Sequence, residues 1–210
     1  MGQRHPVTAK TCFLVGALLL TYSGSAYAQA RRARHGLWMD AALGNGWLHV
    51  SSDTLRGRSQ TGMDFIWDLG WAFSSRVRAG VGVDQWTSAW GGSGKQTWIT
   101  SFNLLFYYYP LARRRFYLQA GAASADYMVV RAGAERVDST YFSGTAWGVT
   151  GAAGWDIPVR GILSVRPLVS YSYGPPRSLH APDGTLIATG WKHHLLSLDL
   201  GLVLHPTDTR

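Results

Sequence analysis

The chain contains a single cysteine, Cys12, so no disulfide bond can form within it. Glu135 is its only glutamate, and we predict no metal site and no cofactor, because His, Cys, Asp and Glu do not cluster at ligand spacings. After residue 29, no apolar run reaches the roughly 20 residues that a membrane-spanning helix needs. The stability of the folded part must therefore come from something other than disulfides, metals or spanning helices.

The first 28 residues instead have the pattern of a secretory signal peptide. Arg4 and Lys10 precede an apolar stretch, Cys12 to Tyr22, and Ala26-Tyr27-Ala28 forms a small-x-small cleavage site. The apolar stretch is too short for a spanning helix, which disfavours an N-terminal membrane anchor. We predict a signal peptide over 1–28, a short basic segment over 29–35, a folded domain over 36–205 and a C-terminal tail over 206–210.

The net charge of +8 comes mainly from arginine. An exported protein is not expected to bind nucleic acid, so anionic lipid headgroups are the more plausible counterpart of this charge. Simple solvation in turns is the alternative explanation, since six of the arginines fall in two short segments: Arg31, Arg32, Arg34, Arg113, Arg114 and Arg115.

Apolar and small or polar residues alternate along most of the chain, which is the pattern of β-strands. The alternation is clearest from Thr61 to Phe73, where bulky apolar residues occupy every second position. It predicts eight strands: 36–50, 61–73, 77–84, 98–108, 118–123, 147–157, 163–173 and 196–205.

The connections between these strands alternate between short and long, as in a membrane barrel with short periplasmic turns and longer extracellular loops. A soluble barrel would turn its apolar face inward, but an eight-stranded lumen is too narrow for so many Trp, Phe, Tyr and Leu side chains. The sequence therefore predicts an all-β fold, an eight-stranded antiparallel transmembrane β-barrel.

In this barrel, aromatic residues are expected to form two girdles at the membrane interfaces. The predicted girdle at the turn end comprises Trp71, Phe73, Tyr108, Phe116, Tyr117 and Trp155. The predicted girdle at the loop end comprises Trp47, Trp86, Trp98, Tyr127, Tyr171, Tyr173 and Trp191.

Several blocks of the chain resemble the small outer-membrane β-barrel proteins, the broad class that contains the OmpA membrane domain and OmpX. The resemblance rests on YYYPLARRRFYLQAGAA (107–123), WGVTGAAGWDIPV (147–159), SVRPLVSYSY (164–173) and HHLLSLDLGLVLH (193–205). It implies a barrel in the bacterial outer membrane, reached after signal-peptide cleavage near Ala28/Gln29 with the help of the outer-membrane assembly machinery. Such barrels usually end on an aromatic residue, whereas this chain continues through Pro206 to Arg210.

The predicted lumen carries isolated charges, which must be paired because an unpaired buried charge is costly. They form a polar network of Asp40, Asp64, Asp68, Arg78, Asp84, Asp156, Arg166 and Asp199, with His205 nearby. Arg78 could meet either Asp64 or Asp68. A structural plug is the favoured interpretation, and a proton path, an ion path or a gated pore is the alternative.

His49 and Ser51 share one face of the first strand and are candidates for a catalytic pair. Lipid A deacylases of the outer membrane use a His and a Ser, but here the residues flanking the pair do not match that motif. His193 and His194 point to opposite faces of a strand and are expected to lie at the membrane interface.

The sequence therefore predicts a monomeric outer-membrane protein without enzymatic activity, with a structural or surface-interaction role. Its expected contacts are outer-membrane lipid or lipopolysaccharide and, through loops 87–96, 126–141 and 174–190, an extracellular ligand. The alternative for these loops is that they only solvate the rim of the barrel. A lipid-modifying enzyme that uses His49 and Ser51 and a narrow pore are the two alternatives.

Overall fold

The computed structural model of the chain describes residues 35–53, 57–88, 95–111, 115–131, 140–174 and 178–205. The predicted signal peptide, nearly all of the basic segment and the C-terminal tail lie outside these ranges. In the described ranges, no helix is long and apolar enough to cross a membrane.

Eight long strands make up the fold, and each runs antiparallel to its neighbours. They are β1 (Gly36–Ser51), β2 (Arg58–Ala72), β3 (Val77–Ser88), β4 (Lys95–Leu111), β5 (Phe116–Arg131), β6 (Thr140–Trp155), β8 (Leu163–Gly174) and β11 (Lys192–Leu204). Most of them extend beyond the predicted bounds, because pairing continues into segments that the sequence marks as loops. β5, for example, extends through Arg131 and into the predicted loop 126–141.

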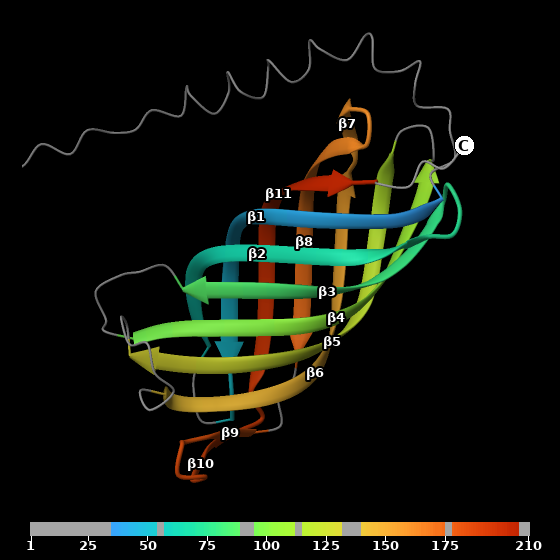
Figure 1. The fold of residues 1–210 in the computed structure, drawn as a ribbon. Helices are drawn as coiled ribbons and strands as arrows, with labels where there is room; N and C mark the ends of the chain where they lie inside the picture. The colour runs from blue at the N-terminus through green and yellow to red at the C-terminus, as the bar shows by residue number, and fades with distance from the viewer. Residues whose placement is uncertain are drawn as a thin grey trace, which may run out of the picture. The chain divides into compact units, whose positions relative to one another are not determined.

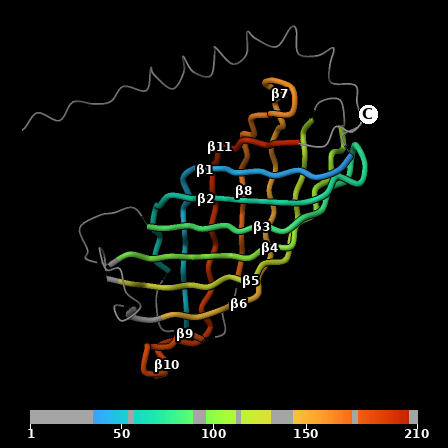
Figure 2. The backbone as a smooth tube through the Cα atoms, in the orientation of Figure 1, coloured from blue at the N-terminus to red at the C-terminus, as the bar shows by residue number. Residues whose placement is uncertain are grey.

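Two pairings close the sheet into a barrel. β1 pairs with β11 along its length, and β6 pairs with β8 from Val149↔Tyr173 to Gly154↔Leu168. In Figures 1 and 2 the strands of opposite walls cross one another, as tilted strands of a barrel do. The prediction of a closed, eight-stranded antiparallel barrel is confirmed.

Three short strands supplement the barrel. β7 (Ile157–Arg160) pairs with β8 at the end with short turns. β9 (Ser178–His180) and β10 (Leu186–Thr189) form a hairpin between β8 and β11, at the end with long loops (Figure 1). This hairpin lies within the predicted loop 174–190, and β9 also pairs with β6 at Ser143↔His180.

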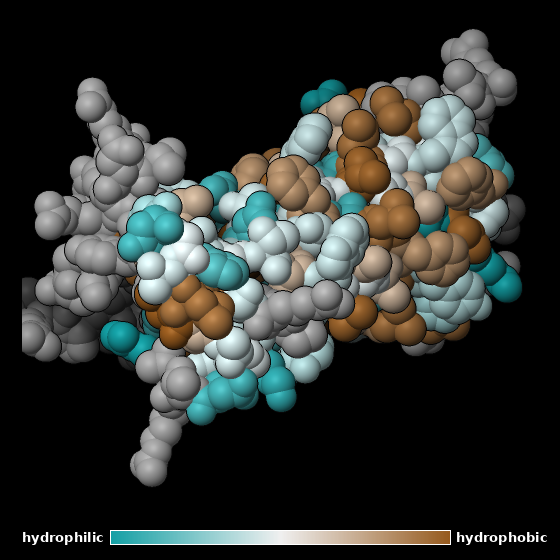
Figure 3. Space-filling model, turned by 90° about the horizontal axis from the view of Figure 1, so that it is seen from below, coloured by the Kyte–Doolittle hydropathy of each residue, from teal (hydrophilic) through white to brown (hydrophobic). Residues whose placement is uncertain are grey.

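The outer wall of the barrel is apolar and the inner wall is not. Large hydrophobic side chains are exposed along every long strand, for example Leu104 at 66% and Trp147 at 77%. Figure 3 shows a broad area of such residues on one face of the molecule. The prediction that the bulky face points outward is confirmed. Contact of this apolar face with lipid is favourable, whereas its contact with water is not.

Four of the aromatic residues predicted for the girdles face the lumen instead: Tyr117, Trp86, Tyr127 and Trp191, all buried. Tyr117, Trp86 and Tyr127 lie on strands that keep their alternation, so the phase of the strand and not the nearness of an interface decides their direction, whereas Trp191 lies just before β11. Glycines make room for the largest of them, since a Cβ on Gly46 or Gly62 would overlap the Trp86 indole. The lumen is therefore filled by large aromatic rings as well as by small and charged residues.

Candidate functional site

The eight charged residues predicted for the lumen all lie on its inner wall and are buried, from Asp64 at 0% exposure to Asp84 at 8%. Strand alternation turns seven of them inward, and Asp156 lies between β6 and β7. The lumen has three levels, which are described from the end with short turns to the end with long loops.

The first level is the turn-end network, which is centred on Arg166 of β8. Its guanidinium donates from Nε to Asp156 Oδ1 at 2.7 Å and from Nη1 to Asp40 Oδ2. A third donor, Nη2, lies 3.3 Å from the Tyr109 hydroxyl. Arg166 is 1% exposed, so its charge is compensated by carboxylates and not by water.

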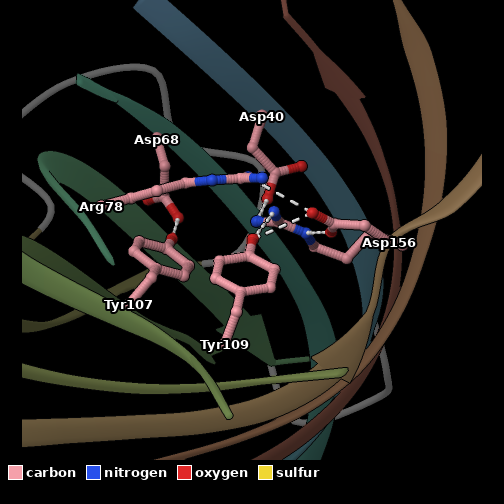
Figure 4. Close-up of polar contacts among 7 residues, drawn as sticks. Asp40, Asp68, Arg78, Tyr107, Tyr109 and Asp156 are labelled. Atoms are coloured by element: carbon pink, nitrogen blue, oxygen red, sulfur yellow. Dashed lines mark hydrogen bonds and ion pairs between the residues drawn. The ribbon is translucent and has the colours of Figure 1, made fainter. Parts of the chain in front are cut away.

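Asp156 joins the two arginines of this network (Figure 4). Its Oδ2 accepts from Arg78 Nη1 at 3.3 Å and from the Tyr109 hydroxyl at 2.9 Å. Of the two partners considered for Arg78 in the sequence, Asp64 and Asp68, neither forms this ion pair. Asp156 lies between β6 and β7, where the chain bends over the turn end, so it reaches Arg78 across the lumen.

Aromatic rings surround these charges. The Arg166 Cζ lies 4.6 Å from the Tyr117 ring centroid and 5.5 Å from that of Tyr107, and the Arg78 Cζ lies 4.3 Å from that of Tyr109. The Tyr107 hydroxyl donates to Asp68 Oδ2 (Figure 4). These tyrosines were not predicted as members of the network, although Tyr107 and Tyr109 lie on the inward phase of β4. Cation–π contacts and phenol donors compensate part of this buried charge, although Asp40 Oδ1 and Asp68 Oδ1 have no hydrogen-bond partner among the described residues.

The second level, the carboxyl tier, consists of Asp64, Asp84 and Asp199. Asp64 and Asp199 both pair in register with Gly44, and the carboxyl of Asp199 occupies the space that a side chain on Gly44 would take. Asp84 lies against Asp64 from β3. In the described part of the chain, no salt bridge includes any of the three.

The third level, the loop-end apolar cluster, has almost no polar atoms. Its members are Leu48, Val50, Trp86, Ile99, Ala125, Tyr127, Val129, Leu179, Ala188, Trp191 and Leu195. Leu179 and Ala188 come from the β9–β10 hairpin, which thus packs into the mouth of the barrel. The Trp86 indole donates from Nε1 to the Gly46 carbonyl at 3.2 Å, which satisfies its one polar group.

The candidate catalytic pair lies outside the lumen, because His49 and Ser51 are on the outward phase of β1. His49 Nδ1 lies 3.0 Å from the hydroxyl of Ser59 on β2, so the serine that His49 contacts is Ser59 and not Ser51. Among the described residues, the backbone N–H groups of β1 beside His49 are used in the β1–β2 and β1–β11 ladders and are not available to form an oxyanion hole. Among the described residues, no group of three or more His, Cys, Asp or Glu is arranged to hold a metal.

No protein-family model and no curated protein sequence matches the chain. Solved structures do match it. Neisserial surface protein A superposes with a TM-score of 0.53 at 15% identity, over 83% of this chain and 99% of that protein. The outer-membrane protein AlkL, solved in lipid bilayers, superposes with a TM-score of 0.52 at 11% identity over the whole of both chains. The chain therefore has the fold of the small outer-membrane β-barrel proteins.

Proposed function

We propose that this chain is a monomeric protein of the bacterial outer membrane whose sealed barrel has a structural or surface-interaction role. The exposed apolar wall supports a location in a bilayer, since closure gives every long strand a paired neighbour on both sides. A closed barrel also has no free edge to pair with another copy, which favours a monomer. In the outer membrane, the short turns would face the periplasm and the β9–β10 hairpin would face the outside of the cell.

The observation that carries this proposal is that the lumen is filled at two separate levels. Arg166 and Tyr107 in the turn-end network and Trp86 and Trp191 in the loop-end apolar cluster are each at most 2% exposed. A side chain that lined a water-filled channel would keep exposed surface. Two dry levels in series therefore argue against the passage of ions or solutes.

The hairpin at the loop end supports a role at the surface. Leu186 and Ile187 on β10 are 54% and 47% exposed, while Leu179 and Ala188 of the same hairpin are buried in the mouth of the barrel. An exposed apolar pair held on an anchored hairpin is suited to contact with another macromolecule.

Conductance of the purified, refolded protein in planar bilayers tests the sealed barrel. We expect a silent bilayer, with the barrel shown to be folded by its resistance to SDS until it is boiled. Stepwise ion conductance from the folded species would contradict the proposal and favour the pore.

The His49–Ser59 hydrogen bond favours a second candidate, an enzyme that modifies membrane lipid. A histidine base beside a serine hydroxyl is the core of acyl-transfer catalysis. In the described part of β1, the N–H groups beside His49 are used in strand pairing, which makes this function the weaker candidate. Mass spectrometry of lipid A from cells with the intact protein and with Ser59→Ala decides between them. Unchanged lipid A in both supports the structural role, whereas loss of an acyl chain that requires Ser59 would establish the enzyme.

A further inference from the structure

A row of polar side chains crosses the outside of the barrel at the loop end. His49 on β1 pairs in register with Ser59 on β2 and with His194 on β11, and His194 pairs with Tyr173 on β8. All four residues are on the outward phase of their strands. In the next outward row toward the turn end, Trp47 and Leu196 are apolar and exposed, and they stand beside Thr61 and Tyr171. The polar row therefore lies where the apolar wall ends.

Two hydroxyl groups orient the two imidazoles of this row. The Ser59 hydroxyl lies 3.0 Å from His49 Nδ1, and the Tyr171 hydroxyl lies 2.7 Å from His194 Nδ1. When a hydroxyl donates to Nδ1, the neutral ring carries its hydrogen on Nε2. Each histidine then presents one N–H donor, and the two ring centroids are 6.3 Å apart. Two rings at this spacing are close enough for one phosphate group, which has several acceptor oxygens, to contact donors on both.

A positive charge stands beside the two donors. Lys192 is exposed on β11, two residues before His194 and on the same face, and it pairs in register with Ser51 of β1. Two N–H donors together with an ammonium group on the same face of the wall favour the binding of phosphate over that of a neutral or zwitterionic group.

We propose that His49, His194, Ser59, Tyr171 and Lys192, the outer histidine cluster, bind the phosphomonoester of an anionic lipid headgroup in the outer leaflet. The acyl chains of this lipid lie along the apolar wall at Trp47 and Leu196. The proposal rests on the membrane location proposed above, because only a bilayer brings a headgroup to this level of the wall. The site holds the lipid and does not cleave it.

Gly57 gives an independent way to disturb the cluster without removing a donor. A Cβ on Gly57 would lie 2.6 Å from Nε2 of the His49 ring, so Gly57→Ala must push the ring aside. Both histidines and Lys192 remain present in this variant, and only the position of one donor changes. A loss of lipid binding in Gly57→Ala would therefore show that the geometry matters as well as the charge.

The test is a titration of the folded protein in phosphatidylcholine nanodiscs, followed by the NMR signals of the imidazoles. The probes are diphosphoryl lipid A, dephosphorylated lipid A with the same acyl chains, and inorganic phosphate. We expect diphosphoryl lipid A to shift the His49 and His194 signals saturably, and the other two probes to leave them unchanged. His49→Phe with His194→Phe, followed by the ring signals of Tyr171, should weaken binding by at least about tenfold, because two hydrogen bonds to a charged group are lost. His180→Phe, at an exposed histidine of β9, is the matched control and should bind as the unaltered protein does.

Three results would overturn the proposal: equal response to dephosphorylated lipid A, equal response to inorganic phosphate, or full binding by the double variant. Recovery of the lipid with an unchanged mass is expected, and a shortened lipid would point to the enzyme instead. Failure of the protein to enter nanodiscs at all would contradict the proposed membrane location, which distinguishes that failure from a failure of this site.

Discussion

The two ends of the lumen are sealed by opposite chemistry. The turn-end network uses two arginines, three aspartates and a wall of tyrosines, whereas the loop-end apolar cluster uses Trp86, Trp191 and aliphatic side chains. Apolar packing can be loosened one side chain at a time, because truncation of one side chain removes its own contacts and leaves a local cavity. A buried ion network cannot, because removing one partner leaves the others uncompensated. The turn end is therefore the more cooperative of the two seals.

Arg166→Met should produce the largest loss of stability. The substitution keeps an apolar stem of similar length but leaves Asp40 and Asp156 without their main cation, at a cost of about 3–5 kcal/mol. Urea unfolding of the protein refolded into vesicles measures this cost. Arg160→Met, at an exposed position of β7, is the control and should change the free energy of unfolding by less than about 0.5 kcal/mol. Equal losses in the two variants would contradict the cooperative network.

Leu179→Ala tests the apolar seal and should cost less, about 2–3 kcal/mol. Leu179 is 1% exposed and anchors the β9–β10 hairpin in the barrel mouth, so its truncation leaves a cavity next to Trp191. Leu186→Ala on the exposed strand of the same hairpin is the matched control, and it should leave stability unchanged. If the two leucine variants unfold at the same urea concentration, the hairpin does not seal the mouth.

A substitution in the carboxyl tier, between the two seals, should raise the free energy of unfolding, whereas the substitutions in the two seals lower it. Asp199→Asn removes one of three neighbouring carboxyls that form no salt bridge in the described ranges, so it should raise the free energy of unfolding by about 1 kcal/mol. The same substitution at Asp156 removes the partner of both arginines and should lower it. A urea titration of the two variants compares them, and stabilisation by both or by neither would mean that the two levels do not differ in charge balance.

The direction of each residue could be read from the sequence, but the partners of the charges could not. Strict alternation turns Tyr107, Tyr109 and Trp86 inward, as it does the aspartates on strands. The prediction of Trp86 as a girdle residue was wrong because it ignored this alternation. Pairing is different, because the stagger between strands decides which side chains meet across the lumen. Arg78 and Asp156 are 78 positions apart in the sequence. No local pattern could have joined them.

The same limit explains the outer histidine cluster. The sequence placed His49 and Ser51 on one face because they are two residues apart. The closer neighbour proved to be Ser59, on the adjacent strand, because the β1–β2 register sets His49 opposite it. A contact across strands depends on the register, which loop length and packing decide together.

The smallest expected effect concerns the tip of the β9–β10 hairpin, where Asp183 Oδ1 accepts a hydrogen bond from the Thr185 backbone N–H at 2.9 Å. This bond lowers the pKa of the Asp183 carboxyl below its usual value. A lowered pKa means that the hydrogen bond contributes fully above the ordinary aspartate pKa of about 3.9 and is lost as the pH falls through the lowered value. The amide signal of Thr185 should therefore move in NMR spectra only at acidic pH, and in Asp183→Asn it should not move, because the amide oxygen still accepts but does not titrate. Since Leu179 and not Asp183 anchors the hairpin, the urea midpoint should stay the same in this variant. A change in that midpoint would mean that the exposed tip, and not the buried leucine, holds the loop-end seal in place.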